Sequence, residues 1–357
     1  MLFPRVKPEH SPYRYDDGTI RIGGELYPVA AEIKDPHGWV WAALGLMNGH
    51  RAAAEIVSEL GARYASLSRS HATDLLDQLM ATGYVEDAAA PAPADLDASA
   101  RERYGRNHAF FRRVDLRPGA SAWEAQTRLR ESRVVVLGLG GTGSHTAWAL
   151  TAAGVGRLHC VDPDVVEVSN LTRQTLYTES DIGRPKAAAA AAALRAVNSG
   201  TTVTYEQRKV TTEQDLKDLV SGFDVLALCA DEPRDDGINR MTSRACAAAG
   251  LPWVGAGYDG PLVTVGVYGP GGPCFECVAA GEEARLRQGP VPHLGGPGVI
   301  APSAGISGHL LAYEIISLLT GVARQPPGYV RGINLIAPDQ LIHVRHPALA
   351  DCETCRG

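Results

Sequence analysis

A glycine-rich turn between an apolar strand and a helix restricts the fold of this chain more than any other feature. The run VVVLGLGGTGS contains four glycines, Gly138, Gly140, Gly141 and Gly143. Glycines at such a turn let the backbone approach a phosphate closely, and the N-terminus of the following helix attracts negative charge. Asp162 comes about 20 residues later, at the end of the next predicted strand, where a carboxylate can bind ribose hydroxyls. The pattern predicts a nucleotide site.

Strands and helices alternate on both sides of this turn, which predicts a largely parallel sheet. The expected strands at 157–162, 202–210 and 224–231 are separated by helical segments, two of them rich in alanine. A later stretch, residues 262–277, has the alternation of an antiparallel hairpin. We therefore expect the α/β fold class, with a Rossmann-like nucleotide-binding domain over residues 101–357.

The first 90 residues have a different pattern and form a separate predicted domain. Residues 91–100 belong to an Ala-, Pro- and Asp-rich stretch, which predicts an extended linker. Ile20, Ile22 and Leu26 flank a Gly-Gly pair and predict a hairpin. Three amphipathic helical patterns and a short strand follow. This order predicts a small winged-helix domain over residues 1–90.

Charge argues against the usual DNA-reading role of that fold. The chain holds 34 Lys and Arg against 40 Asp and Glu, a net charge of −6. The predicted third helix, HATDLLDQLM, carries acids and no base, so a nucleic-acid duplex would repel it. The order of elements resembles the PqqD-like domain, which binds precursor peptides as an added β-strand. That resemblance implies a peptide clamp; the alternative is a packing or dimerisation module without a ligand.

A second motif identifies the nucleotide. The string VEVSNLTRQ supplies Ser169, Asn170 and Arg173, and GRPKA supplies Lys186. A dinucleotide site has little use for two cations beside its phosphates, whereas a triphosphate is neutralised by them while its α-phosphorus is attacked. No Walker A sequence is present, which argues against γ-phosphoryl transfer of the P-loop kind.

Taken together, GLGGTGS, DPDVVEVSNLTRQ, GRPKA, ALCAD and the late GVIAPSAGISGHLLAYEIISLLTG resemble the ThiF/MoeB family of ubiquitin-activating-like adenylyltransferases. The resemblance implies an ATP-dependent adenylyltransferase that uses Mg²⁺. It implies ATP contacts from six residues, Gly141, Asp162, Ser169, Asn170, Arg173 and Lys186. It also implies that Gln174 supports the phosphates.

Two further roles follow from the resemblance. Asp231, in the string ALCAD, would hold the catalytic Mg²⁺; the alternative is a cap for the following helix. Arg106, in the string RYGRNH, would reach into the ATP site of a partner subunit, which implies a homodimer. The alternative for Arg106 is a solvated charge on a helix.

Two CxxC pairs from distant parts of the chain predict a metal site. Their four cysteines are Cys274, Cys277, Cys352 and Cys355. Four thiolates suit a tetrahedral zinc ion with no open coordination position, so the zinc would be structural and would fasten the C-terminal tail. Two disulfides are the alternative. Cys160, Cys229 and Cys246 are expected to be small buried side chains without a catalytic role.

The two predicted domains together resemble the MccB-type enzymes of ribosomal peptide biosynthesis. That resemblance implies adenylation of the C-terminal carboxylate of a precursor peptide, with a peptide–nucleotide conjugate as a further product. The alternatives are activation of a ubiquitin-like sulfur-carrier protein and a non-catalytic role in delivering peptides to a cyclodehydratase. No stretch approaches the roughly 20 apolar residues that span a bilayer, so we expect a cytoplasmic protein without membrane contact.

Overall fold

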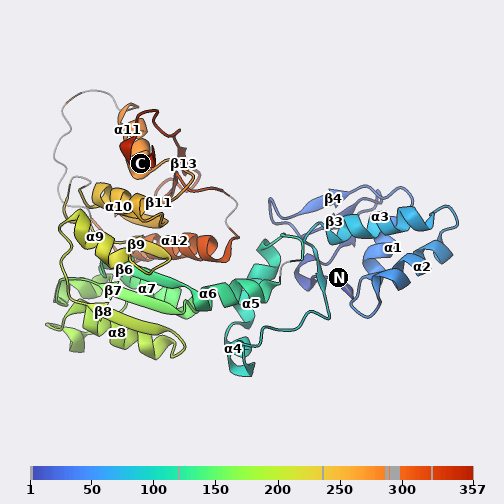
Figure 1. Cartoon of the computed structure of the whole chain (residues 1–357), viewed down its shortest axis with the longest axis horizontal. Helices are drawn as coiled ribbons and strands as arrows, with labels where there is room; N and C mark the ends of the chain where they lie inside the picture. Colours follow the sequence, from blue (N-terminus) through green and yellow to red (C-terminus); the bar gives the residue numbers. More distant parts are fainter. Residues whose placement is uncertain are drawn as a thin grey trace. The chain divides into compact units, whose positions relative to one another are not determined.

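The computed structural model describes residues 3–119, 121–234, 237–285, 289, 298–322 and 325–356. These residues form two compact units, Met1–Thr127 and Arg128–Gly357 (Figure 1). The predicted division at residues 91–100 remains a prediction. No helix among the described residues combines the length and apolarity needed to cross a bilayer.

The N-terminal unit has two small sheets and a helical core. One sheet pairs β1 (Pro4–Val6) antiparallel with β5 (Val85–Asp87), and the other has the order β2-β3-β4. The strands of this second sheet are β2 (Tyr13–Arg14), β3 (Ile20–Ile22) and β4 (Ala31–Ile33). Three helices follow, α1 (Trp39–Leu46), α2 (Ala53–Arg63) and α3 (Arg69–Met80). Their apolar faces and the inner face of β3 bury one common core, which includes Ile20, Ile56, Leu60 and Leu76.

The hairpin differs from its prediction in the length of its loop. The second strand begins at Ala31, and Leu26, expected to be in a strand, is 46% exposed in the loop. A tertiary contact explains the longer loop, because Val29 is buried and its carbonyl accepts a hydrogen bond from Tyr84 Oη at 2.6 Å. This contact folds the loop back over the core.

Three helices complete the region that follows the small module. They are α4 (Ala98–Arg103), α5 (Gly105–Val114) and α6 (Ala122–Glu131). Asp97 caps α4 by accepting a hydrogen bond from the Ala100 amide at 2.8 Å. Phe111 is the buried side chain of α5.

The C-terminal unit is built on one eight-stranded mixed sheet of order β13-β12-β11-β10-β9-β6-β7-β8. The parallel part comprises β6 (Arg133–Leu137), β7 (Arg157–Val161), β8 (Thr202–Glu206), β9 (Val225–Leu228) and β10 (Trp253–Asp259). The antiparallel part comprises β11 (Leu262–Tyr268), β12 (Tyr329–Asn334) and β13 (Leu341–Arg345). Val134, Val135 and Val136 of the central strand are fully buried, which confirms the predicted α/β class.

Helices cover this sheet on both faces. They are α7 (Gly141–Ala153), α8 (Lys186–Val197), α9 (Glu213–Val220), α10 (Gly237–Ala248), α11 (Phe275–Glu283) and α12 (Ala301–Thr320) (Figure 1). A short last helix, α13 (Glu353–Arg356), packs against α10. Small residues let α12 approach α7 closely, since a Cβ on Gly308 would lie 2.4 Å from the Thr142 carbonyl oxygen. The Thr142 and Ser307 hydroxyls hydrogen-bond across this contact at 2.9 Å. The start of α12 is thereby fixed beside the glycine-rich turn.

Candidate active site

The candidate site lies at the point in the sheet where the strand order reverses. Strand β6 is flanked by β7 on one side and β9 on the other, and Leu137 at its end pairs in register with Val161 and Leu228. The residues after these three strands therefore emerge at one edge of the sheet. In open α/β sheets this switch point is the usual ligand site.

The glycine-rich turn is held too tightly for larger residues. Gly138 has φ 90°, and a Cβ on it would lie 2.7 Å from the Ala230 amide nitrogen, so the turn touches the chain just before Asp231. A Cβ on Gly143 would lie 1.9 Å from the Gly138 carbonyl oxygen. The first amides of α7 have no partner within the helix, which is the arrangement that a phosphate site uses.

Asp162 is a buried carboxylate beneath this turn. It is 4% exposed, and its two oxygens accept hydrogen bonds from the Leu139 amide at 2.6 Å and the Asp164 amide at 2.9 Å. Burial raises the pKa of the Asp162 carboxyl, against the opposing effect of those two amide hydrogen bonds. Each oxygen keeps a further lone pair, so the group can also accept hydrogen bonds from ribose hydroxyls.

Arg173 and Gln174 supply polar atoms that lack partners within the described residues. Arg173 follows the short helix η2 (Val168–Thr172), and its Nη1 donates to the Ser169 carbonyl at 3.0 Å. Arg173 Nε and Gln174 Oε1 are buried, and no hydrogen-bond partner is found for them in the described part of the chain. Gln174 Nε2 lies 3.8 Å from the position that a Cβ on Gly140 would take. The orphaned Arg173 Nε is a donor and fits a phosphate of ATP, whereas the orphaned Gln174 Oε1 is an acceptor and would take a donor group.

Asn170 shapes the same segment. It is 6% exposed, and its side-chain oxygen accepts a hydrogen bond from the Glu167 amide at 3.1 Å. This bond closes the N-terminal end of η2, so Asn170 has a structural partner as well as its predicted ligand role. The Ser169 side chain is exposed beside it.

Lys186 is the first residue of α8 and is 6% exposed. Its Nζ donates to Asp164 Oδ2 at 2.9 Å, while Asp164 itself is mostly exposed. The ion pair joins Lys186 to the loop that begins at Asp162. A buried ammonium with one exposed carboxylate partner can exchange that partner for a phosphate.

Asp231 comes three residues after the end of β9 and is exposed at the same edge. An exposed carboxylate is an oxygen ligand of the kind that Mg²⁺ takes together with substrate phosphates. Arg106 lies in the first turn of α5, in the N-terminal unit, and is also exposed. Of the predicted residues, Arg106 is therefore the one that belongs to the other unit.

Two residues at the site were not predicted from the sequence. Tyr258, on β10, places its hydroxyl 3.0 Å from where a Cβ on Gly141 would lie. His145, on α7, hydrogen-bonds the Arg173 backbone, and burial lowers the pKa of its imidazole. His145 directly follows the glycine-rich turn, so its position in the sequence could have indicated that it belongs to the site. Tyr258 reaches the site through strand pairing, and no sequence pattern indicated it.

The four predicted metal ligands converge in the C-terminal unit. Their Sγ atoms all lie within 4.8 Å of one another. Cys274 Sγ lies 3.8 Å from Cys277 Sγ and 3.6 Å from Cys352 Sγ, and Cys277 and Cys355 are also 3.6 Å apart. A tetrahedral zinc with Zn–S bonds of about 2.3 Å has S···S edges of about 3.8 Å. The four cysteines therefore fit zinc, and their separations exceed the roughly 2.05 Å of a disulfide.

Backbone groups support this cluster as they do in zinc–thiolate sites. The Cys274 amide donates to Cys355 Sγ at 3.2 Å, and the Leu349 amide donates to Cys277 Sγ at 3.3 Å. Amide donors stabilise negative charge on sulfur. All four coordination positions would be filled by protein, which assigns the metal a structural role.

The three remaining cysteines are poor nucleophiles. Cys160 and Cys246 are buried and Cys229 is half-buried. Burial raises the pKa of each thiol to about 12. They therefore stay protonated at neutral pH, and none of them has the thiolate that acyl transfer needs.

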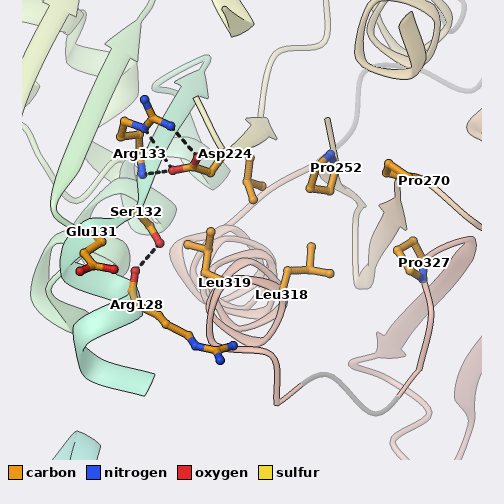
Figure 2. A pocket seen from close by; sticks show the side chains of 11 residues that line it. Arg128, Glu131, Ser132, Arg133, Asp224, Pro252, Pro270, Leu318, Leu319 and Pro327 are labelled. Atoms are coloured by element: carbon orange, nitrogen blue, oxygen red, sulfur yellow. Dashed lines mark hydrogen bonds and ion pairs between the residues drawn. The ribbon is translucent and has the colours of Figure 1, made fainter. Parts of the chain in front are cut away.

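A pocket of 580 Å³ lies at the other edge of the sheet. Figure 2 shows it beside the start of β6, with Arg133 and Asp224 joined by an ion pair and Leu318 and Leu319 on α12. None of the predicted site residues lines it. The candidate site is consequently defined by the carboxyl ends of the strands and not by this pocket.

Comparison with known proteins finds relatives that are adenylyltransferases. Residues 106–355 match the family model described as the ThiF family. The adenylyltransferase and sulfurtransferase MOCS3 of Bos taurus is 38% identical over 237 residues, which is 65% of this chain and 50% of that protein. The sulfur carrier protein ThiS adenylyltransferase of Escherichia coli (strain K12) is 35% identical over 213 residues, 59% of this chain and 80% of that protein. The chain spans about half the length of the MOCS3 relatives that it matches.

The fold of the whole chain also matches a solved structure. The crystal structure of E. coli MccB with ATP has a TM-score of 0.75 and 21% identity, with 99% of both chains covered. A crystal structure of E. coli MccB with AMPCPP and MccA has a TM-score of 0.74, with the same coverage. At this identity the likeness concerns the fold.

Proposed function

This chain is a member of the ThiF family, and from that premise we propose that it uses ATP to adenylate the C-terminal carboxylate of a ribosomally made precursor peptide. The observation that carries the proposal is the convergence of the glycine-rich turn, Asp162, Arg173 and Lys186 at the switch point of the sheet. We propose that the phosphates lie beside Arg173, whose Nε is buried without a hydrogen-bond partner in the described residues.

In the proposed reaction a carboxylate oxygen of the peptide attacks the α-phosphorus of ATP. The bond from the α-phosphorus to the bridging oxygen breaks, and pyrophosphate leaves with its electron pair. Asp162 would hold the ribose, and the amides at the start of α7 would bind phosphate oxygens. Arg173 and Lys186 would stabilise the charge that builds on the departing pyrophosphate.

Lys186 changes partner in this scheme. Its ion pair with Asp164 keeps the ammonium beside the ribose-binding loop before ATP binds. The phosphates would then replace Asp164, which is exposed and readily solvated. Because Lys186 is 6% exposed, its attraction to a phosphate is weakened less by water than that of a surface lysine.

We assign Asp231 as the ligand of a catalytic Mg²⁺, which when bound would neutralise charge on the phosphates. The exposed carboxylate follows Ala230, whose amide lies against Gly138 of the turn. Asp231 therefore stands close to the phosphate-binding amides. We assign Arg106 to the ATP site of a second subunit, in a homodimer.

The zinc cluster has no step in this reaction. Its four thiolates would fasten the C-terminal tail to the segment at the start of α11. Since the other three cysteines are protonated and none of them is fully exposed, we propose that the acyl adenylate is released or used directly, without a thioester on one of these three thiols.

A precursor peptide is favoured as substrate by the N-terminal unit. The solved MccB structure that contains MccA resembles this chain along 99% of its length, including that unit. We propose that residues 1–90 bind the peptide along an open edge of the β2-β3-β4 sheet, as the PqqD-like pattern implies. A peptide strand there would have main-chain partners on one side and the α3 region of the core nearby.

A sulfur-carrier protein is the second candidate substrate, favoured by the sequence identity to the ThiS adenylyltransferase. The test offers the full chain two substrates in parallel, and measures pyrophosphate release. One is a set of synthetic peptides with free C-terminal carboxylates, and the other is a small carrier protein ending in Gly-Gly. Peptide-dependent release supports the proposal. Release with the carrier alone would replace the peptide by the carrier, and release with neither would favour the non-catalytic delivery role.

A further inference from the structure

The N-terminal unit holds both the hairpin proposed to bind peptide and the helix that carries Arg106. We propose that Arg112 is a positioning residue that locks these two parts into one rigid body, so that capture of the peptide also fixes the place of Arg106. The inference rests on the proposed function, because it assigns a use to the clamp and to Arg106 together. It is carried by contacts within the N-terminal unit alone.

Arg112 fastens α5 to the small module by two ion pairs. Its Nη2 donates to Glu86 Oε1 on β5 at 2.8 Å, and its Nε lies 3.2 Å from Glu9 Oε2 in the short helix η1 (Pro8–His10). The side chains of Arg112, Glu9 and Glu86 are only 11%, 17% and 17% exposed. Glu86 has a second partner, Arg5, whose Nη2 lies 2.6 Å from Glu86 Oε1, whereas Arg112 is the one ion-pair partner found for Glu9 in the described residues. Removing Arg112 would therefore leave the poorly exposed Glu9 carboxylate uncompensated.

The chain just after α5 is packed into the same module. Lys7 is 2% exposed, and its Nζ donates to the Asp115 carbonyl at 2.9 Å. Gly83 has φ 77°, and a Cβ on it would lie 2.0 Å from the Leu116 carbonyl oxygen. The backbone of residues 115–116 therefore lies directly against Gly83, between α3 and β5, and no side chain fits between them.

A continuous line of buried contacts leads from α5 to the hairpin. The Arg112 carbonyl accepts a hydrogen bond from His10 Nε2 at 3.1 Å, and the His10 and Tyr84 rings pack edge to face at 5.1 Å. Tyr84 Oη donates to the carbonyl of Val29, in the loop that joins β3 to β4. The hairpin loop and the Arg106 helix thus contact one shared pair of buried rings.

This arrangement makes a prediction that a flexible tether does not make. In a tether, residues 88–97 set the effective concentration of the captured peptide, so doubling their length would raise KM about threefold. In the rigid body the connection is anchored near both ends, because the Ala88 amide donates to the Phe3 carbonyl at 2.9 Å and Leu96 is buried. Residues inserted in the exposed stretch between these anchors do not move the packed contacts. Their length then has no effect on KM or kcat while Arg112 is present.

The first experiment cleaves the full chain within residues 88–97. A protease site is inserted after Ala92, the protein is cleaved, and its fragments are separated by size exclusion under native conditions. We expect the fragments to stay together in the parent protein and in Arg113→Ala, which removes an exposed charge of the same helix. We expect Arg112→Ala and the milder Glu9→Gln, which removes the charge that pairs with Arg112 alone, to release the N-terminal fragment. Release from the parent protein would overturn the inference.

The second experiment measures ATP–pyrophosphate exchange with a long synthetic peptide that supports pyrophosphate release, and with a shortened peptide that keeps its C-terminal end. A Gly-Ser insertion that doubles residues 88–97 should leave KM and kcat unchanged. Arg112→Ala should lower kcat with the long peptide by about 100-fold, because Arg106 is misplaced. It should also make KM sensitive to the insertion, whereas Arg113→Ala should do neither.

Direct binding separates this inference from the proposed function. Fluorescence anisotropy of the labelled long peptide reports capture without chemistry. Binding that survives in Arg112→Ala, together with an unchanged kcat, would overturn the positioning role and leave the peptide clamp standing. An absence of peptide binding to the parent protein would overturn the proposed function and this inference with it.

Discussion

Removal of the C-terminal zinc ligands should destabilise the C-terminal unit by a predictable amount. The double variant Cys352→Ser and Cys355→Ser removes both thiolates of the tail and leaves Cys274 and Cys277 in place. Cys274 and Cys352 lie 78 positions apart, so zinc closes a long loop. The entropy of closing such a loop corresponds to about 4.5 kcal/mol at 25 °C, by the chain-entropy relation used for disulfides.

This free energy converts into a measurable shift in Tm. For a unit of this size, each kcal/mol lowers Tm by roughly 2–4 °C, so the variant should melt about 9–18 °C below the parent protein. The assay is thermal unfolding followed by circular dichroism, together with the zinc content by elemental analysis. A matched control replaces Asp351 and Glu353, the exposed neighbours of Cys352, by Ser.

Two results would refute this reasoning. One is a variant that melts within a few degrees of the control, which would mean that the tail is not cross-linked. The other is a parent protein without zinc in which Cys274, Cys277, Cys352 and Cys355 are oxidised. A chelator should lower Tm of the parent protein and leave the double variant unchanged, because binding free energy of a structural metal is folding free energy.

Three other predictions concern the nucleotide site and the dependence on pH. Asp231→Asn should reduce ATP–pyrophosphate exchange by at least about 100-fold with unchanged Tm and ATP binding, because the carboxylate is exposed and acts on the metal; normal exchange would remove Asp231 from the site. Gly143→Ala should abolish the ATP binding measured by calorimetry, because its Cβ would lie 1.9 Å from the Gly138 carbonyl oxygen. The control Gly61→Ala, which has open space around its Cβ, should bind ATP normally. Equal binding by the two variants would contradict the tight packing of the turn. Burial lowers the pKa of five histidines, His10, His108, His145, His159 and His309. Because the unfolded chain then binds more protons than the folded one, the free energy of unfolding should fall as pH drops below about 6.5. Thermal melts over this range test it, and His159→Gln should flatten the slope; a Tm that rises on acidification would be contrary.

The sequence predicted those parts of the fold that local patterns decide. Apolar strands followed by glycine or acidic residues placed Gly138, Asp162 and Asp231 at strand ends, and parallel pairing brought these ends to one edge. The cysteine spacing predicted the cluster because four thiolates have few other uses in such pairs. The sequence indicated less clearly that the sheet combines parallel and antiparallel strands. Strand β13 alternates between exposed and half-buried positions at the sheet edge, and its pattern is weak.

Features set by tertiary contacts were not predictable in this way. The loop after Ile22 is longer than the Gly-Gly pair predicts, because Tyr84 holds Val29 from a distant part of the chain. Tyr258 reaches the glycine-rich turn through the pairing of β10 with β9, and no local pattern reports that pairing. The ion pairs of Arg112 join segments separated by many residues, so only the folded chain shows that α5 belongs to the N-terminal unit.

The most direct test of the proposed reaction follows one oxygen atom. The synthetic peptide is prepared with ¹⁸O in its C-terminal carboxylate and incubated with the full chain, ATP and hydroxylamine to capture the activated acyl group. Attack of that carboxylate on the α-phosphorus predicts that one ¹⁸O atom appears in the AMP released, as measured by mass spectrometry. Label in inorganic phosphate would mean attack on the γ-phosphorus, and label in neither product would mean that the peptide carboxylate is not activated; either result would contradict adenylation.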